Sequence, residues 1–248
     1  MPGTSGNRYE SPEPHFSIVI PARNEERFIG HCLESIRKAS RGMEQDVETI
    51  VVLNRCTDRT AEIAAGFGAR LVREDAKNLS RIRNAGAGQA RGKILITIDA
   101  DSAMTPNTLR AVERALASRK TVGGGTWIRP ERFSIGIVAS ILVMAPFIVI
   151  PWISGGMFWC LREDFEALGG FNENLITAED LDFARRLRLY GKRVGRPFST
   201  LRGGYIVTSC RKFDRYGDWA VITKPLFMWR LFRGSRQVAD EYFYEFER

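Results

Sequence analysis

The chain has 248 residues, 44% of them hydrophobic, which suits one large domain or two halves that share a core. Its formal net charge of +8 favours anionic partners: nucleoside diphosphates, phospholipid surfaces or nucleic acid. With 2 histidines and 4 scattered cysteines, and no CxxC or Cys/His ligand spacing, the composition argues against a histidine-based mechanism or a Cys/His metal site and predicts reduced cytosolic thiols.

The N-terminal part of the chain begins with a polar stretch and then takes up a β/α pattern. Residues 1–14 are rich in Pro, Gly and Ser, which predicts a disordered tail without a cleavable signal peptide. Residues 16–20 form a predicted strand that ends at Pro21. Asn24 is placed to cap a helix whose apolar residues lie on one face.

Strands and helices then alternate along the chain. Further strands are predicted at residues 47–53, 69–72 and 94–98. Thr57 or Asp58 would cap the helix after the second strand. Thr105 and Pro106 would begin the helix after the last one, as N-cap and first-turn proline. This order predicts an α/β fold with a mostly parallel sheet and right-handed crossovers.

The stretch KILITIDADSAM, residues 93–104, combines a buried strand with two acids. Its apolar, β-branched run predicts a strand of a parallel sheet, followed at once by Asp99 and Asp101 with the small Ala100 between them. Side chains two apart in an extended chain point to the same side, so both acids could converge on one cation at the ligand-binding edge of the sheet. Hard divalent cations prefer carboxylate oxygens, completed by water and phosphate. The alternative is an acidic turn that only ends the strand.

Five segments, in this order, resemble family-2 glycosyltransferases of the GT-A fold: FSIVIPARNEERFIGHCLESI, VVLNRCTDRT, RNAGAGQARGKILITIDADS, GGMFWCLREDFEALGGFNENL and AEDLDFARRL. The resemblance covers roughly residues 16–215. It implies a Rossmann-like, mostly parallel sheet flanked by helices, with a nucleotide-binding half followed by an acceptor-binding half. It also implies a nucleotide-sugar donor, a divalent metal (Mn²⁺ or Mg²⁺) and an inverting transfer to an acceptor hydroxyl.

The resemblance assigns the nucleobase and ribose to loops after the first two strands. The first of these loops contains Pro21, Ala22, Arg23 and Glu25. Many members have an aromatic residue at the position of Arg23, whose guanidinium can also stack on a base. Asn54 stands where an aspartate often accepts the uracil N–H. Because an amide offers both a donor and an acceptor, the identity of the base stays open.

The resemblance also assigns the phosphates and the metal. Arg83 matches an arginine before the central strand and could face the nucleotide, and the alternative is a solvated helix cation. Asp101 is expected to contact the metal directly. Asp99 is expected to bind the ribose or to support the metal through water, with Ala100 beside it. Arg211, in TSCRKF, is expected to close over the phosphates.

The second half is expected to hold the acceptor. Gly155, Gly156 and Met157 precede or begin an apolar strand, and the glycines would let a substrate approach the backbone, unless they only form a bend. Glu179 and Asp180 begin a predicted helix, where acids are often only partners of the helix dipole. By the resemblance, Asp180 is the base that deprotonates the acceptor hydroxyl, and Glu179 is a supporting acid at the acceptor.

Two further segments suggest a membrane surface. Residues 133–153 carry no charge and are long enough for a transmembrane helix, but Pro146 and Pro151 would break a simple one, and a span would separate the two acid pairs that one site needs. We therefore expect a helix that lies on the bilayer or covers the acceptor groove, with a buried core or dimer helix as the alternative. The basic and aromatic segment 219–248 suits an anionic lipid surface, or a docked terminal helix.

The sequence therefore predicts a tail at 1–14, a glycosyltransferase domain at 15–218 with nucleotide-sugar half 15–104 and acceptor half 105–218, and a helical segment at 219–248. The acceptor is unknown, with a lipid-linked acceptor as one option. The alternatives are a retaining transferase of the same fold and a catalytically silent, membrane-associated nucleotide-sugar binder. The expected location is cytoplasmic, with peripheral attachment to the inner face of the membrane. Nucleic acid is not expected, because no RNA- or DNA-binding motif accompanies the charge.

Overall fold

The computed structural model describes residues 13–43, 46–149 and 156–223, and its first half has the predicted β/α order. The elements are β1 (Phe16–Ala22), α1 (Ile29–Ala39), β2 (Val47–Leu53), α2 (Thr60–Gly66), β3 (Arg70–Arg73), α3 (Leu79–Ala87) and β4 (Ile94–Ile98). β1 pairs in parallel with β2 and with β4, and β2 pairs in parallel with β3. The prediction of a parallel sheet is confirmed for this half.

The second half adds antiparallel strands to the same sheet. Its elements are β5 (Ser102–Met104), α4 (Thr108–Ala117), β6 (Gly123–Pro130), α5 (Ile135–Val149), β7 (Met157–Leu161), α6 (Arg162–Ala167), α7 (Glu179–Arg193), β8 (Phe198–Thr208), α8 (Arg211–Tyr216) and α9 (Ala220–Thr223). β7 runs antiparallel between β4 and β6, β6 and β8 are parallel, and β5 pairs antiparallel with β8. In the described residues the strand order is β3-β2-β1-β4-β7-β6-β8-β5.

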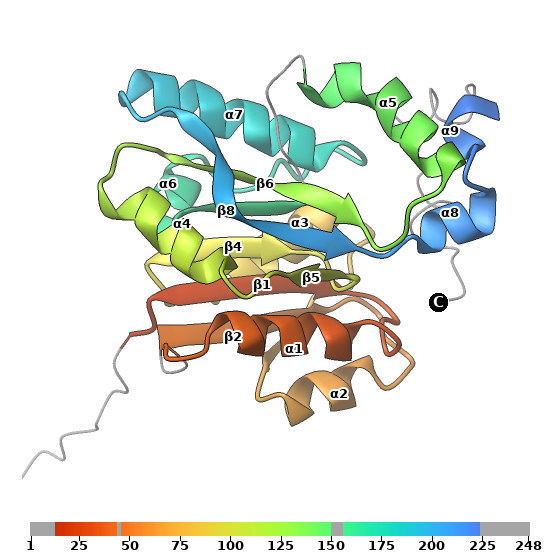
Figure 1. Ribbon diagram of the computed structural model, residues 1–248. Coiled ribbons are helices and arrows are strands. Elements are labelled where there is room, and N and C mark those ends of the chain that lie inside the picture. The colour runs from red at the N-terminus through yellow and green to blue at the C-terminus, as the bar shows by residue number, and fades with distance from the viewer. Residues whose placement is uncertain (1–12, 44–45, 150–155, 224–248) are drawn as a thin grey trace, which may run out of the picture.

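The sheet carries a hydrophobic core on each face (Figure 1). One core packs α1 and α4 against the strands and contains Ile18. The other core packs α3, α6 and α7 against the opposite face and contains Val19 and the stacked rings of Phe171 and Phe183. Neighbouring strand residues point to opposite faces, so a strand between two cores is apolar throughout. This double burial explains the mostly apolar sequences of β1 and β4, in which Ser17 and Thr97 are buried polar residues.

The first two loops after strands are tied together by side chains. Asn24 does not cap α1, which begins at Ile29 without a side-chain cap. Asn24 instead takes a left-handed conformation (φ 50°), which asparagine tolerates, and its Oδ1 accepts from the Thr57 N–H at 2.8 Å. Asp58 accepts from the Thr60 N–H at 3.0 Å, so Asp58 rather than Thr57 supports the start of α2.

The helix predicted from Thr105 begins later. The chain first forms the short strand β5, and α4 starts at Thr108 with Asn107 as its N-cap. Thr105 Oγ1 instead accepts from the Tyr205 N–H at 3.2 Å, which joins the end of β5 to β8. The prediction was wrong because residues 102–104 pair with a strand a hundred residues away, a contact that local signals do not report.

The uncharged segment forms α5, which lies beside α8 and α9 at one end of the molecule (Figure 1). α5 continues through position 146, so Pro146 does not end it, contrary to prediction; Pro151 lies outside the described residues. Several apolar side chains around its first turns are exposed, including Phe133 (58%), Ile135 (81%) and Leu142 (66%). Among the described residues, no helix is long and apolar enough to cross a membrane.

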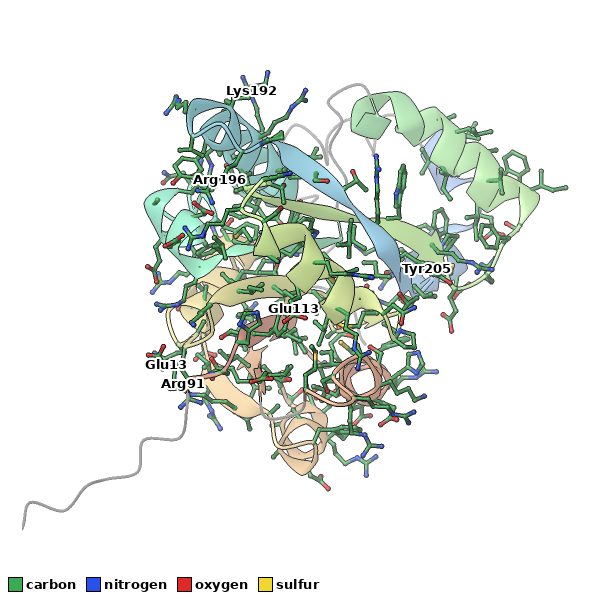
Figure 2. The ribbon with its side chains drawn as sticks, turned by 60° about the vertical axis from the view of Figure 1, so that its left-hand side comes forward. Glu13, Arg91, Glu113, Lys192, Arg196 and Tyr205 are labelled. Carbon is green, nitrogen blue, oxygen red and sulfur yellow. The ribbon has the colours of Figure 1, made fainter. Side chains whose placement is uncertain are left out.

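The opposite end of the molecule is closed by an ion pair. Arg196, labelled in Figure 2, follows α7 and lies on the side away from α5. Its guanidinium binds both oxygens of the buried Asp164 of α6, at 2.6 and 3.0 Å. A two-bond contact of this kind fixes the loop between α7 and β8 against α6.

Candidate active site

Six of the described strands end at one edge of the sheet, β3 among them because it is parallel to β2. β1, β2 and β4 are parallel, and β6 and β8 share their direction because β7 is antiparallel to both β4 and β6. The loops that follow β1, β2 and β4, the start of α7 and the start of α8 therefore meet there, as expected for the ligand-binding edge of an α/β sheet.

A pocket opens at this edge, and most of the predicted site residues line it. Those predicted from the sequence are Pro21, Ala22, Arg23, Glu25, Asn54, Asp99, Ala100, Asp101, Glu179 and Arg211. The fold thus gathers residues from both predicted halves, separated by up to 190 positions along the chain, in one cavity.

The pocket also contains residues that the sequence analysis missed. They are Leu79, Ile82, Ile176 and Lys212. Leu79 and Ile82 come from the first turns of α3, and Ile82 directly precedes Arg83. Lys212 directly follows Arg211. Adjacency to predicted site residues was the available signal for Ile82 and Lys212, whereas Ile176 lies in a loop without any local signal.

One side of the pocket is formed by an arginine between two carboxylates. Arg211 Nη1 lies 2.6 Å from Glu25 Oε2, and Nη2 lies 2.8 Å from Asp101 Oδ2. The Glu25 side chain is only 3% exposed, and the Phe28 ring lies 5.1 Å from the guanidinium carbon. Burial opposes the charge of Arg211, but Asp101 and Glu25 outweigh it and raise the pKa of the guanidinium. Glu25 thus binds Arg211, a partner that the sequence did not indicate.

A second arginine bridges the other two carboxylates. Arg83 Nη2 lies 2.8 Å from Asp99 Oδ1, and Nη1 lies 2.8 Å from Glu179 Oε1. The Arg83 side chain is 6% exposed, and the Phe171 ring lies 5.2 Å from its guanidinium carbon. Arg83 is therefore not a solvated helix cation. It lies behind Asp99 and Glu179 and fixes the two carboxylates relative to each other.

Asn54 presents a defined end of its amide. The residue is 1% exposed, and its Nδ2 donates to the backbone carbonyls of Glu74 and Ala76, the latter at 2.9 Å. The Arg55 guanidinium lies 3.3 Å from Oδ1. Because backbone carbonyls occupy the amide nitrogen, Asn54 can offer a ligand only its oxygen, a hydrogen-bond acceptor.

The acids at the start of α7 lie in different surroundings. Glu179 is 6% exposed; burial and the neighbouring Asp180 raise its pKa to about 7, and Arg83 opposes them. Asp180 is half-buried and is not part of the pocket lining. Within the described residues, its carboxylate makes no hydrogen bond or ion pair. Ala178, immediately before them, has a left-handed conformation (φ 58°) that is costly for alanine and sets the direction in which both acids leave the loop.

The predicted acceptor segment is only partly described. Gly155 lies outside the described residues. Gly156 has φ 78°, and a Cβ there would come within 2.8 Å of Ile128 and Ile206, so the position requires glycine. Met157 is fully buried and pairs with Ile98 of β4. Its side chain belongs to the core, and contact between this position and the acceptor stays a prediction.

The pocket offers a divalent cation two carboxylates, those of Asp99 and Asp101. No group of three or more His, Cys, Asp or Glu side chains surrounds a common position in the described ranges. Asp99 and Asp101 do line one pocket, and the arginines engage one oxygen of each, Oδ1 and Oδ2 respectively. Mg²⁺ and similar ions are commonly held by one or two carboxylates plus substrate phosphates, and the two carboxylates present here fit the protein's part of that donor set.

Comparison with known proteins places the chain in a family. The family model described as Glycosyl transferase family 2 matches residues 17–169. The minor teichoic acid biosynthesis protein GgaA of Bacillus subtilis is 24% identical over 237 residues, which cover 87% of this chain and 52% of that protein. The dolichyl-phosphate beta-glucosyltransferase of Drosophila melanogaster is 32% identical over 107 residues, 38% of this chain and 33% of that protein. The chain thus spans about half or less of these relatives.

Solved structures share the fold. TarS 1–349 of S. aureus in complex with UDP-GlcNAc has a TM-score of 0.63 at 17% identity, over 78% of this chain and 58% of that one. The mannosyltransferase PcManGT of Pyrobaculum calidifontis, in complex with GDP-Man and Mn²⁺, has a TM-score of 0.63 at 22% identity, over 89% and 61%. Likeness at this identity establishes the fold, and the predicted GT-A fold is confirmed. The chain belongs to glycosyl transferase family 2.

Proposed function

We propose that the protein is a metal-dependent, inverting glycosyltransferase that moves a sugar from a nucleotide-sugar donor to an acceptor hydroxyl. The observation that supports this most is that Asp99, Asp101, Glu179 and Arg211 all line the same pocket. Solved neighbours of the same fold were crystallised with UDP-GlcNAc or with GDP-Man and Mn²⁺, which supports a donor of this class and a divalent cation.

On the donor side, each group has a distinct task. Asp101, with Asp99, would hold the cation, which when bound neutralises charge on the departing diphosphate. Arg211 and Lys212 lie at the same pocket and add positive charge for the phosphates. Arg23 would stack on the nucleobase, and Asn54 Oδ1 would accept from it. Uracil and guanine both carry a ring N–H that suits such an acceptor, so Asn54 leaves both bases open.

On the acceptor side, Asp180 is the proposed base. An inverting displacement needs one carboxylate to take the proton of the attacking hydroxyl, opposite the leaving phosphate. Glu179 is engaged by Arg83 at 2.8 Å, whereas Asp180 is half-buried and adjacent to it. Glu179 is therefore assigned to support of the acceptor. A retaining transferase would need another role for Asp180, and a catalytically silent binder would not need it.

A thermal-shift panel tests the donor assignment. Melting temperature is measured with UDP-, GDP- and dTDP-sugars, each with and without Mn²⁺. A ligand at 100 times its Kd stabilises the folded state by about 2.7 kcal/mol, or roughly 5–10 °C for a chain of this size. We expect one base to give such a shift only when Mn²⁺ is present. No shift with any sugar nucleotide would remove the donor class, and hydrolysis of the stabilising donor then separates an enzyme from a silent binder.

We also propose peripheral attachment to the inner face of the membrane, which would bring the site to a lipid-linked acceptor from the cytoplasm. The helix α5, with its exposed apolar side chains, packs against α9, the described start of the basic and aromatic segment 219–248. Residues 224–248 lie outside the described residues. Trp219 at 48% exposure continues this apolar surface. Apolar insertion together with attraction to anionic lipid is the usual basis of such attachment.

Liposome flotation tests the attachment. The protein should float with anionic vesicles at low salt, and less with neutral vesicles, which offer no charge attraction. High salt should weaken binding to anionic vesicles only in part, because salt screens the charge attraction but not the apolar insertion. Ile135→Glu with Leu142→Glu should abolish flotation, since both residues are exposed on α5. Leu189→Glu, a matched change at an exposed leucine of α7, should not. Absence of binding to anionic vesicles at low salt would contradict the proposed membrane attachment.

A further inference from the structure

Arg211 occupies one of the two carboxylate oxygens that Asp101 could offer a cation. Its Nη2 lies 2.8 Å from Asp101 Oδ2, and the Ser209 hydroxyl lies 3.4 Å from the same oxygen. The Asp101 side chain is 12% exposed, so solvent screens this contact only in part. A cation bound to Asp101 and a guanidinium on the same carboxylate would repel each other at close range.

From this contact we propose that Arg211 and the divalent cation compete for Asp101, and that Glu25 is the positioning residue that keeps Arg211 at the pocket after displacement. The proposal rests on the proposed function, which supplies the cation and the diphosphate. Displacement from Asp101 leaves Arg211 attached to Glu25 and turned toward the phosphates. The same arginine then opposes the cation in the donor-free state and favours the donor in the cation-bound state.

Glu25 is built to hold Arg211. It makes two contacts with the guanidinium, at 2.6 and 3.1 Å, and is almost fully buried. Its backbone is fixed as well, because its N–H donates to Thr60 Oγ1 at 2.7 Å and its carbonyl accepts from the Ile29 N–H at 2.8 Å. Without the Arg211 guanidinium, the Glu25 carboxylate would be a buried charge without a counter-charge, which is costly. Arg211 therefore stays paired with Glu25.

The backbone of α8 is anchored from the opposite side. Arg132, which precedes α5, binds Asp214 at 2.6 Å and Asp218 at 2.8 Å. The Cys210 thiol, at the N-cap of α8, lies 3.7 Å from the Arg132 carbonyl. With α8 held by these contacts, displacement of Arg211 from Asp101 requires only its side chain to move.

This arrangement makes cation and diphosphate binding cooperative. A diphosphate that draws Arg211 away from Asp101 raises the affinity for the cation, and by reciprocity the cation raises the affinity for the diphosphate. The apparent cation affinity of the donor-free protein equals the intrinsic affinity multiplied by the fraction of time that Arg211 does not hold Asp101. Removing Arg211 should then change the two affinities in opposite directions, which a merely structural role would not do.

The test measures Mn²⁺ binding directly, by the electron paramagnetic resonance signal of unbound Mn²⁺, without any turnover. In Arg211→Gln, Mn²⁺ alone should bind about 3- to 10-fold more tightly than in the wild type. The affinity for UDP or GDP at saturating Mn²⁺ should fall about 10- to 100-fold, because a charge-assisted contact with the diphosphate is lost. Arg211→Lys keeps the charge but cannot bridge Glu25 and Asp101 with two nitrogens. Both of its affinities should lie between those of the wild type and those of Arg211→Gln.

Two controls separate competition from a general loss of positive charge. Lys212→Gln removes a charge from the same pocket and should leave the affinity for Mn²⁺ alone near the wild-type value. In an Asp101→Asn background, Arg211→Gln should give no gain. Equal or weaker Mn²⁺ binding in both Arg211 variants overturns the competition while the proposed function stands. Absence of Mn²⁺ binding in the wild type, with and without nucleotide, overturns both.

Discussion

Asp180→Asn is expected to lower turnover by about 10²- to 10⁴-fold, the usual contribution of a general base, with donor affinity unchanged. The substitution keeps the volume and much of the hydrogen bonding of the side chain but cannot accept the proton. Donor affinity should survive because the residues proposed to hold metal and nucleotide, Asp99, Asp101 and Asn54, lie in the loops after β4 and β2 and not on α7. Hydrolysis of the donor by water, which needs the same base, allows the measurement before the acceptor is identified.

Two neighbouring acids serve as controls for Asp180. Asp182→Asn removes a first-turn charge of α7 that is paired with Arg186 at 2.7 Å, and turnover should stay near that of the wild type. Glu179→Gln should have a smaller effect than Asp180→Asn. If Glu179→Gln is inactive while Asp180→Asn turns over normally, the base is the other acid of the pair. If both turn over normally, the inverting mechanism has lost its base.

Asp101→Asn is expected to abolish Mn²⁺-dependent donor binding without unfolding the protein. The amide keeps the shape of the side chain but removes the charge that a hard cation requires. The fold should persist, because Arg211 keeps its contacts with the buried Glu25. The measurement is the nucleotide Kd with Mn²⁺ and with EDTA, alongside circular dichroism. The two Kd values should become equal in the variant.

An exposed acid at the same edge of the sheet provides the matched control. Asp75 follows β3, is exposed and is not part of the pocket lining. Asp75→Asn should keep the wild-type difference between Mn²⁺ and EDTA. Unchanged Mn²⁺-dependent affinity in Asp101→Asn would remove the metal assignment to this residue.

The part of the fold that could be predicted is the part recorded in local patterns. β1 and β4 are buried on both faces, so their runs of Val and Ile identify them without any knowledge of their neighbours. The pair Asp99 and Asp101 could be placed at the edge of the sheet because it directly follows such a run. The start of α7 at Glu179 also agreed with the prediction.

The contacts between site residues could not be predicted in the same way. Arg83 and Glu179 are 96 positions apart, and Glu25 and Arg211 are 186 apart. Composition and spacing identify each charge but not its partner, which depends on how the sheet is ordered. The burial of the Met157 side chain could not be predicted for a related reason: glycines before a strand indicate a close approach, but the register with β4 decides which side chains are buried.

The ion pair between Glu25 and Arg211 also has a consequence for the folding of the protein. One partner belongs to the first loop of the chain and the other to the last described helices, so the contact spans most of the sequence. Such non-local contacts form late, after the loop between them has been closed. During synthesis, the nucleotide-binding half would emerge with Glu25 lacking its counter-charge, and that half would gain its full stability only when α8 docks. Completion of the pocket would then be a late step of folding, and a nascent chain that has not yet released α8 would be folded in part and inactive.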